Sequence, residues 1–133
     1  MQHHISAITF LVDDYDNAIE YFTQTLNFTL TENRDKGEGA RFVLVTPKGS
    51  ATSLLLANAK SDDDKALIGR QAGSKVFMIL QTDDFWRDHQ LMRAKGVEFL
   101  ETPREEAYGT VAIFKDYCGN KWDLLQPAPV DLN

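Results

Sequence analysis

The sequence predicts an α+β fold in which two tandem βαβββ modules form a cup-shaped, eight-stranded mixed sheet. The chain repeats itself at a constant offset, and each copy reads as a strand, a helix and three further strands, the last two joined by a glycine-centred turn. With 133 residues the chain is long enough for one domain with a sizeable core. We therefore expect residues 1–133 to form a single domain, with module one at about 5–57, a connector at about 58–74 and module two at about 75–127.

Each module is predicted to begin with an alternating strand, two acids and a helix. The segment TFLVDDYDNAIEYFTQTLNF (residues 9–28) resembles ILQTDDFWRDHQLMRAKGVEF (residues 79–99). Acids at this position cap a helix N-terminus and interact favourably with its dipole. The helices should end near Asn27 and Gly96, residue types that tolerate a left-handed backbone. The residues expected on the sheet-facing side of each helix match at an offset of 70 residues. They are Tyr15, Ile19 and Phe22 in the first copy, and Phe85, His89 and Met92 in the second.

The same offset relates the later strands. ARFVLVTPKGSATSLLL (residues 40–56) lies over TVAIFKDYCGNKWDLLQ (residues 110–126), which places Gly49 over Gly119. The polar connector between the modules, with one short helix, is interpreted either as a plain linker or as a loop over a binding site. If each helix covers one face of a four-stranded sheet, the two free faces can form a cup, which is a natural site for a small molecule.

Composition limits the kinds of partner. The chain has 14 Lys and Arg against 20 Asp and Glu, a net charge of −6, which argues against nucleic acid and against an anionic membrane surface. No apolar run approaches the roughly 20 residues of a membrane-spanning helix, and the N-terminus does not resemble a signal segment. The single Cys118 cannot close an internal disulfide. These observations predict a cytoplasmic protein without a nucleic-acid or membrane partner.

The repeated modules, with VDDYDNAIEYFTQTLNF near the start and KDYCGNKWDLLQP near the end, resemble the vicinal oxygen chelate superfamily. This superfamily contains glyoxalase I, extradiol dioxygenases, and the bleomycin and fosfomycin resistance proteins. The resemblance covers roughly residues 5 to 127 and is closest to small glyoxalase-like bacterial proteins. It implies the glyoxalase/bleomycin resistance/dioxygenase fold and, commonly, a homodimer. It does not imply one activity, because the superfamily hosts several.

Metal-dependent members of this family place His or Glu ligands on the first and last strands of each module. The resemblance carries these positions onto Ala7, Ser53, Phe77 and Asp123. Only Asp123 is a good ligand, whereas catalytic metal sites generally use about three protein ligands. The sequence therefore predicts no metal site of the usual kind and no cofactor. His3 and His4 remain as possible ligands that fold back from the N-terminus, and His89 is expected to be a packed, hydrogen-bonded core residue.

Strand alternation predicts which residues line the cup. Residues of the other parity, such as Phe10, Met78, Trp122 and Leu124, should pack under the helices. Arg41 and Tyr108 lie near strand starts and could reach the rim, where an arginine can hold an anion bidentately, although a solvated arginine explains Arg41 equally well. The predicted ligand-binding residues are Ala7, Thr9, Leu11, Arg41, Ser53, Leu55, Phe77, Ile79, Tyr108, Asp123 and Leu125.

Three functional hypotheses follow. The first is a metal-free protein that binds a small, partly apolar organic molecule. The second is a divergent enzyme of lyase, isomerase or dioxygenase type, in which Asp123 does acid–base work with a rim residue such as Tyr108 or Arg41. The third is a metal-dependent lyase or dioxygenase that uses His3 or His4 together with Asp123. Asp123 can alternatively be a carboxylate that only accepts hydrogen bonds from a neighbour or water.

Overall fold

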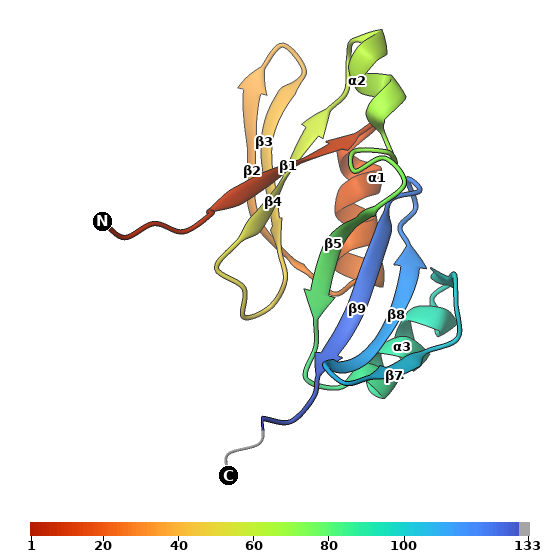
Figure 1. The fold of residues 1–133 in the computed structure, drawn as a ribbon. Coiled ribbons are helices and arrows are strands. Elements are labelled where there is room, and N and C mark those ends of the chain that lie inside the picture. The colour runs from red at the N-terminus through yellow and green to blue at the C-terminus, as the bar shows by residue number, and fades with distance from the viewer. Residues whose placement is uncertain (131–133) are drawn as a thin grey trace. The chain divides into compact units, whose positions relative to one another are not determined.

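The computed structural model describes residues 1–130; the last three residues of the predicted domain lie outside this range. The chain divides into two compact units, Met1–Ile68 and a second that begins at Gly69, so the boundary falls inside the predicted connector. Each unit contains one sheet and one main helix, which is the predicted α+β class (Figure 1). No helix among the described residues is long and apolar enough to span a membrane.

The first unit has a four-stranded sheet in the order β1-β4-β3-β2. Strands β1 and β4 are parallel, and the other neighbours are antiparallel. The helix α1 continues as one π-helical turn, η1, and a short helix α2 lies in the connector and packs against β1. The elements are β1 (Ala7–Val12), α1 (Tyr15–Glu20), η1 (Tyr21–Thr25), β2 (Thr29–Gly37), β3 (Ala40–Thr46), β4 (Ser53–Asn58) and α2 (Asp62–Leu67).

The second unit repeats this plan with one difference. Its sheet runs β5-β9-β8-β6, and β7 also pairs with β8, so the single strand predicted after the helix is divided in two. Pro103 lies at the break, where its fixed φ and missing N–H oppose a continuous ladder. The elements are β5 (Val76–Gln81), α3 (Phe85–Ala94), β6 (Glu98–Phe99), β7 (Arg104–Glu106), β8 (Gly109–Lys115) and β9 (Lys121–Pro127).

Each helix packs on one face of its own sheet, as the alternation predicts. In the first unit Phe22 packs edge-on against Phe10 of β1, with ring centroids 5.2 Å apart. In the second unit Trp122 is only 2 % exposed and stacks on Phe114, which confirms its placement in the core. The buried apolar residues of these two faces include Phe10, Val12, Ala18, Phe22, Val43, Val45, Leu54 and Leu56, and Phe85, Met92, Ala112, Phe114, Trp122 and Leu124.

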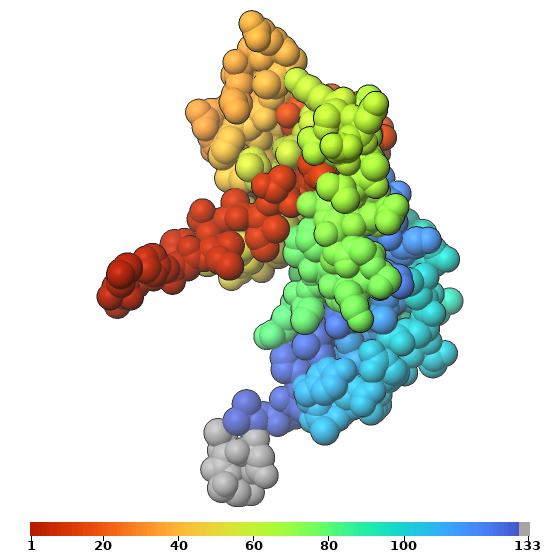
Figure 2. Space-filling model, turned by 45° about the horizontal axis from the view of Figure 1, so that its top comes forward, coloured from red at the N-terminus to blue at the C-terminus, as the bar shows by residue number. Residues whose placement is uncertain are grey.

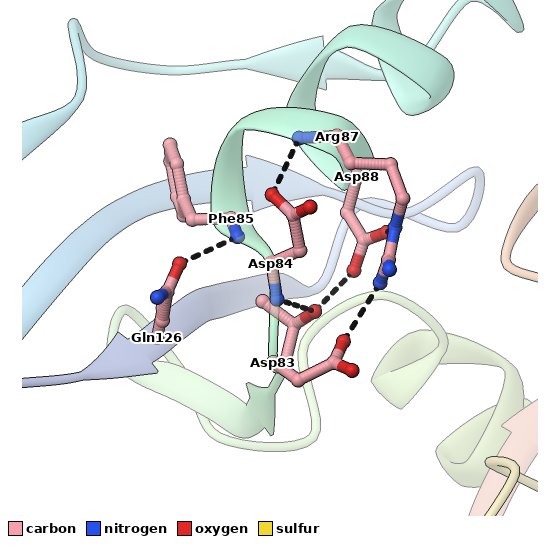
Figure 3. A network of polar contacts seen from close by, with 7 residues as sticks. Asp83, Asp84, Phe85, Arg87, Asp88 and Gln126 are labelled. Atoms are coloured by element: carbon pink, nitrogen blue, oxygen red, sulfur yellow. Dashed lines mark hydrogen bonds and ion pairs between the residues drawn. The ribbon is translucent and has the colours of Figure 1, made fainter. Parts of the chain in front are cut away.

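The predicted helix ends are confirmed. The carboxylates of Asp14 and Asp84 cap α1 and α3, and Asn27 and Gly96 adopt positive φ values of 61° and 89°. At the start of α3 the Asp84 side chain accepts the backbone N–H of Arg87 at 3.1 Å (Figure 3).

Strand β9 also takes part in this cap. The side-chain oxygen of Gln126 accepts the backbone N–H of Phe85 at 2.8 Å, which ties the first turn of α3 to the sheet (Figure 3). The Arg87 guanidinium completes the network with an ion pair to Asp83 at 2.8 Å.

His89 packs among aromatic rings on the inner side of α3. Its ring lies 4.4 Å from that of Phe99 and stacks on Phe85 at 5.5 Å. Burial lowers the pKa of His89 below 6.5, and the neighbouring Arg93 charge lowers it further.

We expect this histidine to make stability pH-dependent. A histidine whose folded-state pKa is depressed contributes stability above its unfolded pKa of about 6.5, and this stability is lost as pH falls through the folded pKa. The free energy of unfolding, measured with urea at pH 7.5 and pH 5.5, should therefore fall more for the wild type than for His89→Phe. Equal decreases in the two proteins would contradict this assignment.

Candidate functional site

The face of the first sheet opposite α1 carries the predicted positions Ala7 and Ser53. These residues are directly paired across β1 and β4. The Ser53 hydroxyl lies 2.6 Å from that of Thr46, which in turn lies 2.9 Å from that of Thr31. Three strands therefore contribute one row of hydroxyls to this face. The remaining predicted residues of this face are Thr9, Leu11 and Leu55, with Thr9 paired to Leu55.

The corresponding face of the second sheet carries Asp123 at its centre. Its cross-strand neighbours are Ile79 on β5 and Ile113 on β8, and both are apolar. Ile79 is 66 % exposed. Leu125 follows on the same face, paired with Gln81. The side of this sheet away from α3 is thus apolar around one half-buried carboxylate.

Burial raises the pKa of the Asp123 carboxyl above its usual value. The Arg104 charge opposes this effect, and the Glu101 charge adds to it. Arg104 itself forms ion pairs with Glu101 at 3.1 Å and with Glu106 at 2.7 Å. The Tyr108 side chain also interacts with Arg104, so this predicted residue lies near these ion pairs. The guanidinium therefore has two carboxylate partners already and is not available as an isolated anion receptor.

Arg104 and Glu101 were not among the predicted site residues. A signal for the arginine was present in the sequence, because the 70-residue offset places Arg34 over Arg104. Arg34 has a similar environment in the first unit: its guanidinium pairs with Glu32 at 2.6 Å and lies 4.9 Å from the centre of the Phe42 ring. The equivalence of Arg34 and Arg104 was not recognised, because the first module has no counterpart to the division of the strand into β6 and β7.

Arg41 does not join the other predicted residues. It has the strand parity of Val43, which faces α1. Its guanidinium donates to Asp16 at 2.9 Å and to Asn33 at 3.0 Å, and lies over the Tyr15 ring. The structure therefore places Arg41 on the helix-covered side of the sheet, where it links α1 to β2.

The four positions that correspond to metal ligands do not fit a divalent metal. Ala7 and Phe77 have no donor atom, the Ser53 hydroxyl bonds Thr46, and only Asp123 is a good ligand. Phe77 lies at an irregularity in the β5–β9 register, between Val76 and Met78, so Asp123 pairs with Ile79.

The N-terminal histidines lie before the first strand. Residues 1–4, which include His3 and His4, are exposed and extend beyond the first sheet (red in Figures 1 and 2), whereas the carbonyls of Ile5 and Ser6 accept hydrogen bonds from Thr52 and Ser53. Within residues 1–130, no group of three or more His, Cys, Asp or Glu side chains is arranged to hold a metal ion.

The second unit also has an open depression of about 660 Å³ outside these faces. It lies along the segment that follows α3. Of its lining residues, only Glu101 forms an ion pair with Arg104. None of the predicted binding residues lines it. The lining residues are Arg93, Glu98, Phe99, Leu100, Glu101, Thr102 and Pro103.

Comparison with known proteins assigns the family. Residues 2–124 match the model of the Glyoxalase/Bleomycin resistance protein/Dioxygenase superfamily. An uncharacterised protein of Shewanella frigidimarina is 47% identical over 128 residues, with 95% of each chain covered.

Solved structures agree with this assignment. TnmS3, an antibiotic-binding protein from Streptomyces sp. CB03234, has 28% identity and a TM-score of 0.77, covering 96% of this chain and 98% of its own. UcmS2 has 25% identity and a TM-score of 0.81, covering 94% and 98%. The family resemblance inferred from the repeated modules is therefore confirmed, and the chain belongs to the Glyoxalase/Bleomycin resistance protein/Dioxygenase superfamily.

Proposed function

We propose that this protein is a metal-free binding protein that holds a small, partly apolar organic molecule on a free sheet face. The main support for this proposal is the chemistry of the four positions that correspond to metal ligands in the family. Ala7, Ser53, Phe77 and Asp123 replace a metal-ligand set, while the surrounding faces keep apolar side chains with a few polar points. Such surfaces suit organic ligands. The similarity to TnmS3, described as antibiotic-binding, supports the same function.

The proposed contact residues come from both units, each considered by itself. Tyr108 is included because its side chain interacts with Arg104, whereas Arg41 is left out because its guanidinium already donates to Asp16 and Asn33. The set is Ala7, Thr9, Leu11, Ser53, Leu55, Phe77, Ile79, Tyr108, Asp123 and Leu125. Residues 1–133 act as one domain in this proposal, and the protein works in the cytoplasm, where Cys118 stays reduced.

The sheet edges support self-association, with a homodimer as the simplest form. Strands β1 (AITFLV) and β5 (VFMILQ) are edge strands without charged side chains. The opposite edge of the first sheet, β2, carries four charged residues and two register irregularities, features that discourage pairing. Sedimentation equilibrium would test this: a monomer at all concentrations would contradict the homodimer.

The binding function can be tested with protein treated with a chelator and titrated with a panel of aromatic and alicyclic compounds. We expect saturable binding without consumption of the compound, and amide shifts in β5 and β9 by ¹⁵N NMR. Ile79→Asp should weaken binding at least about tenfold, because it places a charge on the apolar face.

The matched control is Leu91→Asp, which changes an exposed leucine of α3 that is 54% accessible. It should leave the affinity within about twofold. Equal losses in the two variants, or no binding by any compound in the panel, would contradict the proposed function.

A second candidate function is a divergent enzyme that uses Asp123 as a proton carrier. The raised pKa of this carboxyl favours it, because acid–base groups act best when their pKa approaches the working pH. In that case Asp123→Ala abolishes turnover and leaves the fold intact. The metal-dependent alternative predicts instead that removal of the first four residues, including His3 and His4, abolishes metal binding.

A further inference from the structure

Two lysines face each other at one end of the second sheet. Lys115, the last residue of β8, and Lys121, the first residue of β9, are direct cross-strand partners beside the turn that joins these strands. Cross-strand partners of an antiparallel pair have Cβ atoms about 5 Å apart, and like charges at such positions destabilise a sheet. An anion bound between the two lysines would offset this repulsion.

Neither lysine is neutralised within the second unit. Among residues 69–130, no carboxylate forms an ion pair with Lys115 or Lys121, although Glu98 on β6 is also a register partner of Lys115. Within the same residues the Lys121 ammonium donates only to the backbone carbonyl of Ser74, at 3.4 Å. A neutral carbonyl accepts a hydrogen bond but leaves the positive charge uncompensated.

Both lysines lie on the face that carries Asp123. Lys121 precedes Asp123 by two residues on β9, and Lys115 follows Ile113, a cross-strand partner of Asp123, by two residues on β8. Strand residues two apart project from the same face, about 7 Å from each other. The intervening Trp122 is buried on the opposite face, in agreement with this alternation. One face therefore has a row of two lysines beside the turn and a carboxylate in the next row.

The surroundings of Asp123 favour a cation. No N–H or O–H group of residues 69–130 donates a hydrogen bond to its half-buried carboxylate. The nearby Arg104 guanidinium forms ion pairs with Glu101 and Glu106, so these three side chains together carry one positive and two negative charges. A cationic partner would offset the cost of desolvating the Asp123 carboxylate.

The same face supplies apolar contacts for the body of a ligand. Ile79 and Ile113 lie on either side of Asp123, Leu125 follows it on β9, and Ile79 is 66% exposed. We infer that the free face of the second sheet binds a dipolar ligand: an aromatic or alicyclic body with a cationic amine that contacts Asp123 and an oxyanion that contacts Lys115 and Lys121. This inference rests on the proposed binding function, names its ligand class and involves the second unit only.

The test titrates three probes that share one benzene ring into the full chain at pH 7.5, where carboxylates and alkylamines are both ionised. 4-(Aminomethyl)benzoate carries an ammonium and a carboxylate at opposite ends of the ring, benzylamine carries only the ammonium, and 4-methylbenzoate carries only the carboxylate. Binding is followed by ¹⁵N NMR at the amides of β8 and β9. We expect 4-(aminomethyl)benzoate to bind about fivefold more tightly than either singly charged probe, the gain expected for one partly exposed ion pair.

Two variants assign the two ends of the ligand separately. In Asp123→Asn, the affinity for 4-(aminomethyl)benzoate should come within about twofold of that for 4-methylbenzoate, because the ammonium has lost its carboxylate partner, while the advantage over benzylamine is kept. Lys115→Gln/Lys121→Gln should show the reverse: the advantage over benzylamine is lost, and the advantage over 4-methylbenzoate is kept.

The controls remove the same charges from the helix-covered side of the second sheet. Arg93→Gln/Lys95→Gln removes two positive charges at the end of α3, which packs on the other face of the sheet. Glu105→Gln removes one carboxylate whose strand parity is that of the helix-covered face. Both controls should keep both advantages of 4-(aminomethyl)benzoate. Urea unfolding of all four variants checks that the fold is intact.

The outcomes separate the inference from the proposed function. The crossed pattern of losses, with both advantages kept in the controls, supports the inference. Equal binding of the three probes, a gain from one charge alone, or advantages that survive in Asp123→Asn and Lys115→Gln/Lys121→Gln overturn the inference. So does the absence of binding by all three probes when neutral compounds of the panel still bind, and in each of these cases the binding function stands. If neither the probes nor the panel bind, both are overturned.

Discussion

Asp116→Ala should destabilise the protein more than any other single substitution considered, by roughly 3–5 kcal/mol in the free energy of unfolding. Asp116 is 4 % exposed and organises the β8–β9 turn. One carboxylate oxygen accepts the backbone N–H groups of Cys118, Gly119 and Asn120 at 2.9–3.0 Å. The other accepts the Asn120 side-chain amide at 3.1 Å and the Trp122 indole N–H at 2.8 Å. Alanine would leave several of these donors without a partner.

Urea unfolding followed by tryptophan fluorescence would measure this loss. Asp35→Ala is the matched control, because the Asp35 carboxylate also accepts a turn N–H, that of Gly37 at 2.8 Å, but is exposed. Water can replace that bond, so the control should lose less than about 1 kcal/mol. A loss in Asp116→Ala no greater than in Asp35→Ala would show that the buried network does not stabilise the fold.

Gly69→Ala is expected to cost about 3–4 kcal/mol, combining left-handed backbone strain with overpacking. Gly69 has a φ of +77°, and a Cβ there would lie 2.0 Å from the carbonyl oxygen of Cys118. That oxygen belongs to the backbone of the β8–β9 turn, which is already held by Asp116. Neither side of the contact can move without disturbing the turn.

Gly73→Ala separates strain from overpacking. Gly73 lies in the same segment with a φ of +66°, but a Cβ there would have no atom within 4 Å. This variant should therefore lose only the strain contribution, about 1–2 kcal/mol, in thermal or urea unfolding. Comparable losses at Gly69 and Gly73 would contradict the close approach of Gly69 to the turn.

Much of the fold follows from local patterns that the sequence displays openly. The acids Asp14 and Asp84, and the stops at Asn27 and Gly96, mark the two helices because capping and left-handed geometry depend on neighbouring residues only. Pro103 can be read in the sequence, but the division of the strand at this residue was not predicted, because the repeat indicated one continuous strand.

The polar partners on the free faces could be predicted only in part. Alternation identified Ser53 and Asp123 as residues of the free face, each in its own sheet. It could not reveal that Arg104 pairs with Glu101 and Glu106, or that Arg41 turns toward Asp16, because strand alternation does not specify side-chain conformations.

The sequence by itself determined the family, the α+β class and the repeated strand–helix plan, because these depend on residue identity and spacing. Only the tertiary structure decided the contacts within the Thr31–Thr46–Ser53 row, the environment that raises the pKa of Asp123, and the network around Asp116. The reason is physical: hydrogen-bond partners, burial and charge pairing depend on which atoms approach one another in space, and residue identity and spacing do not specify this.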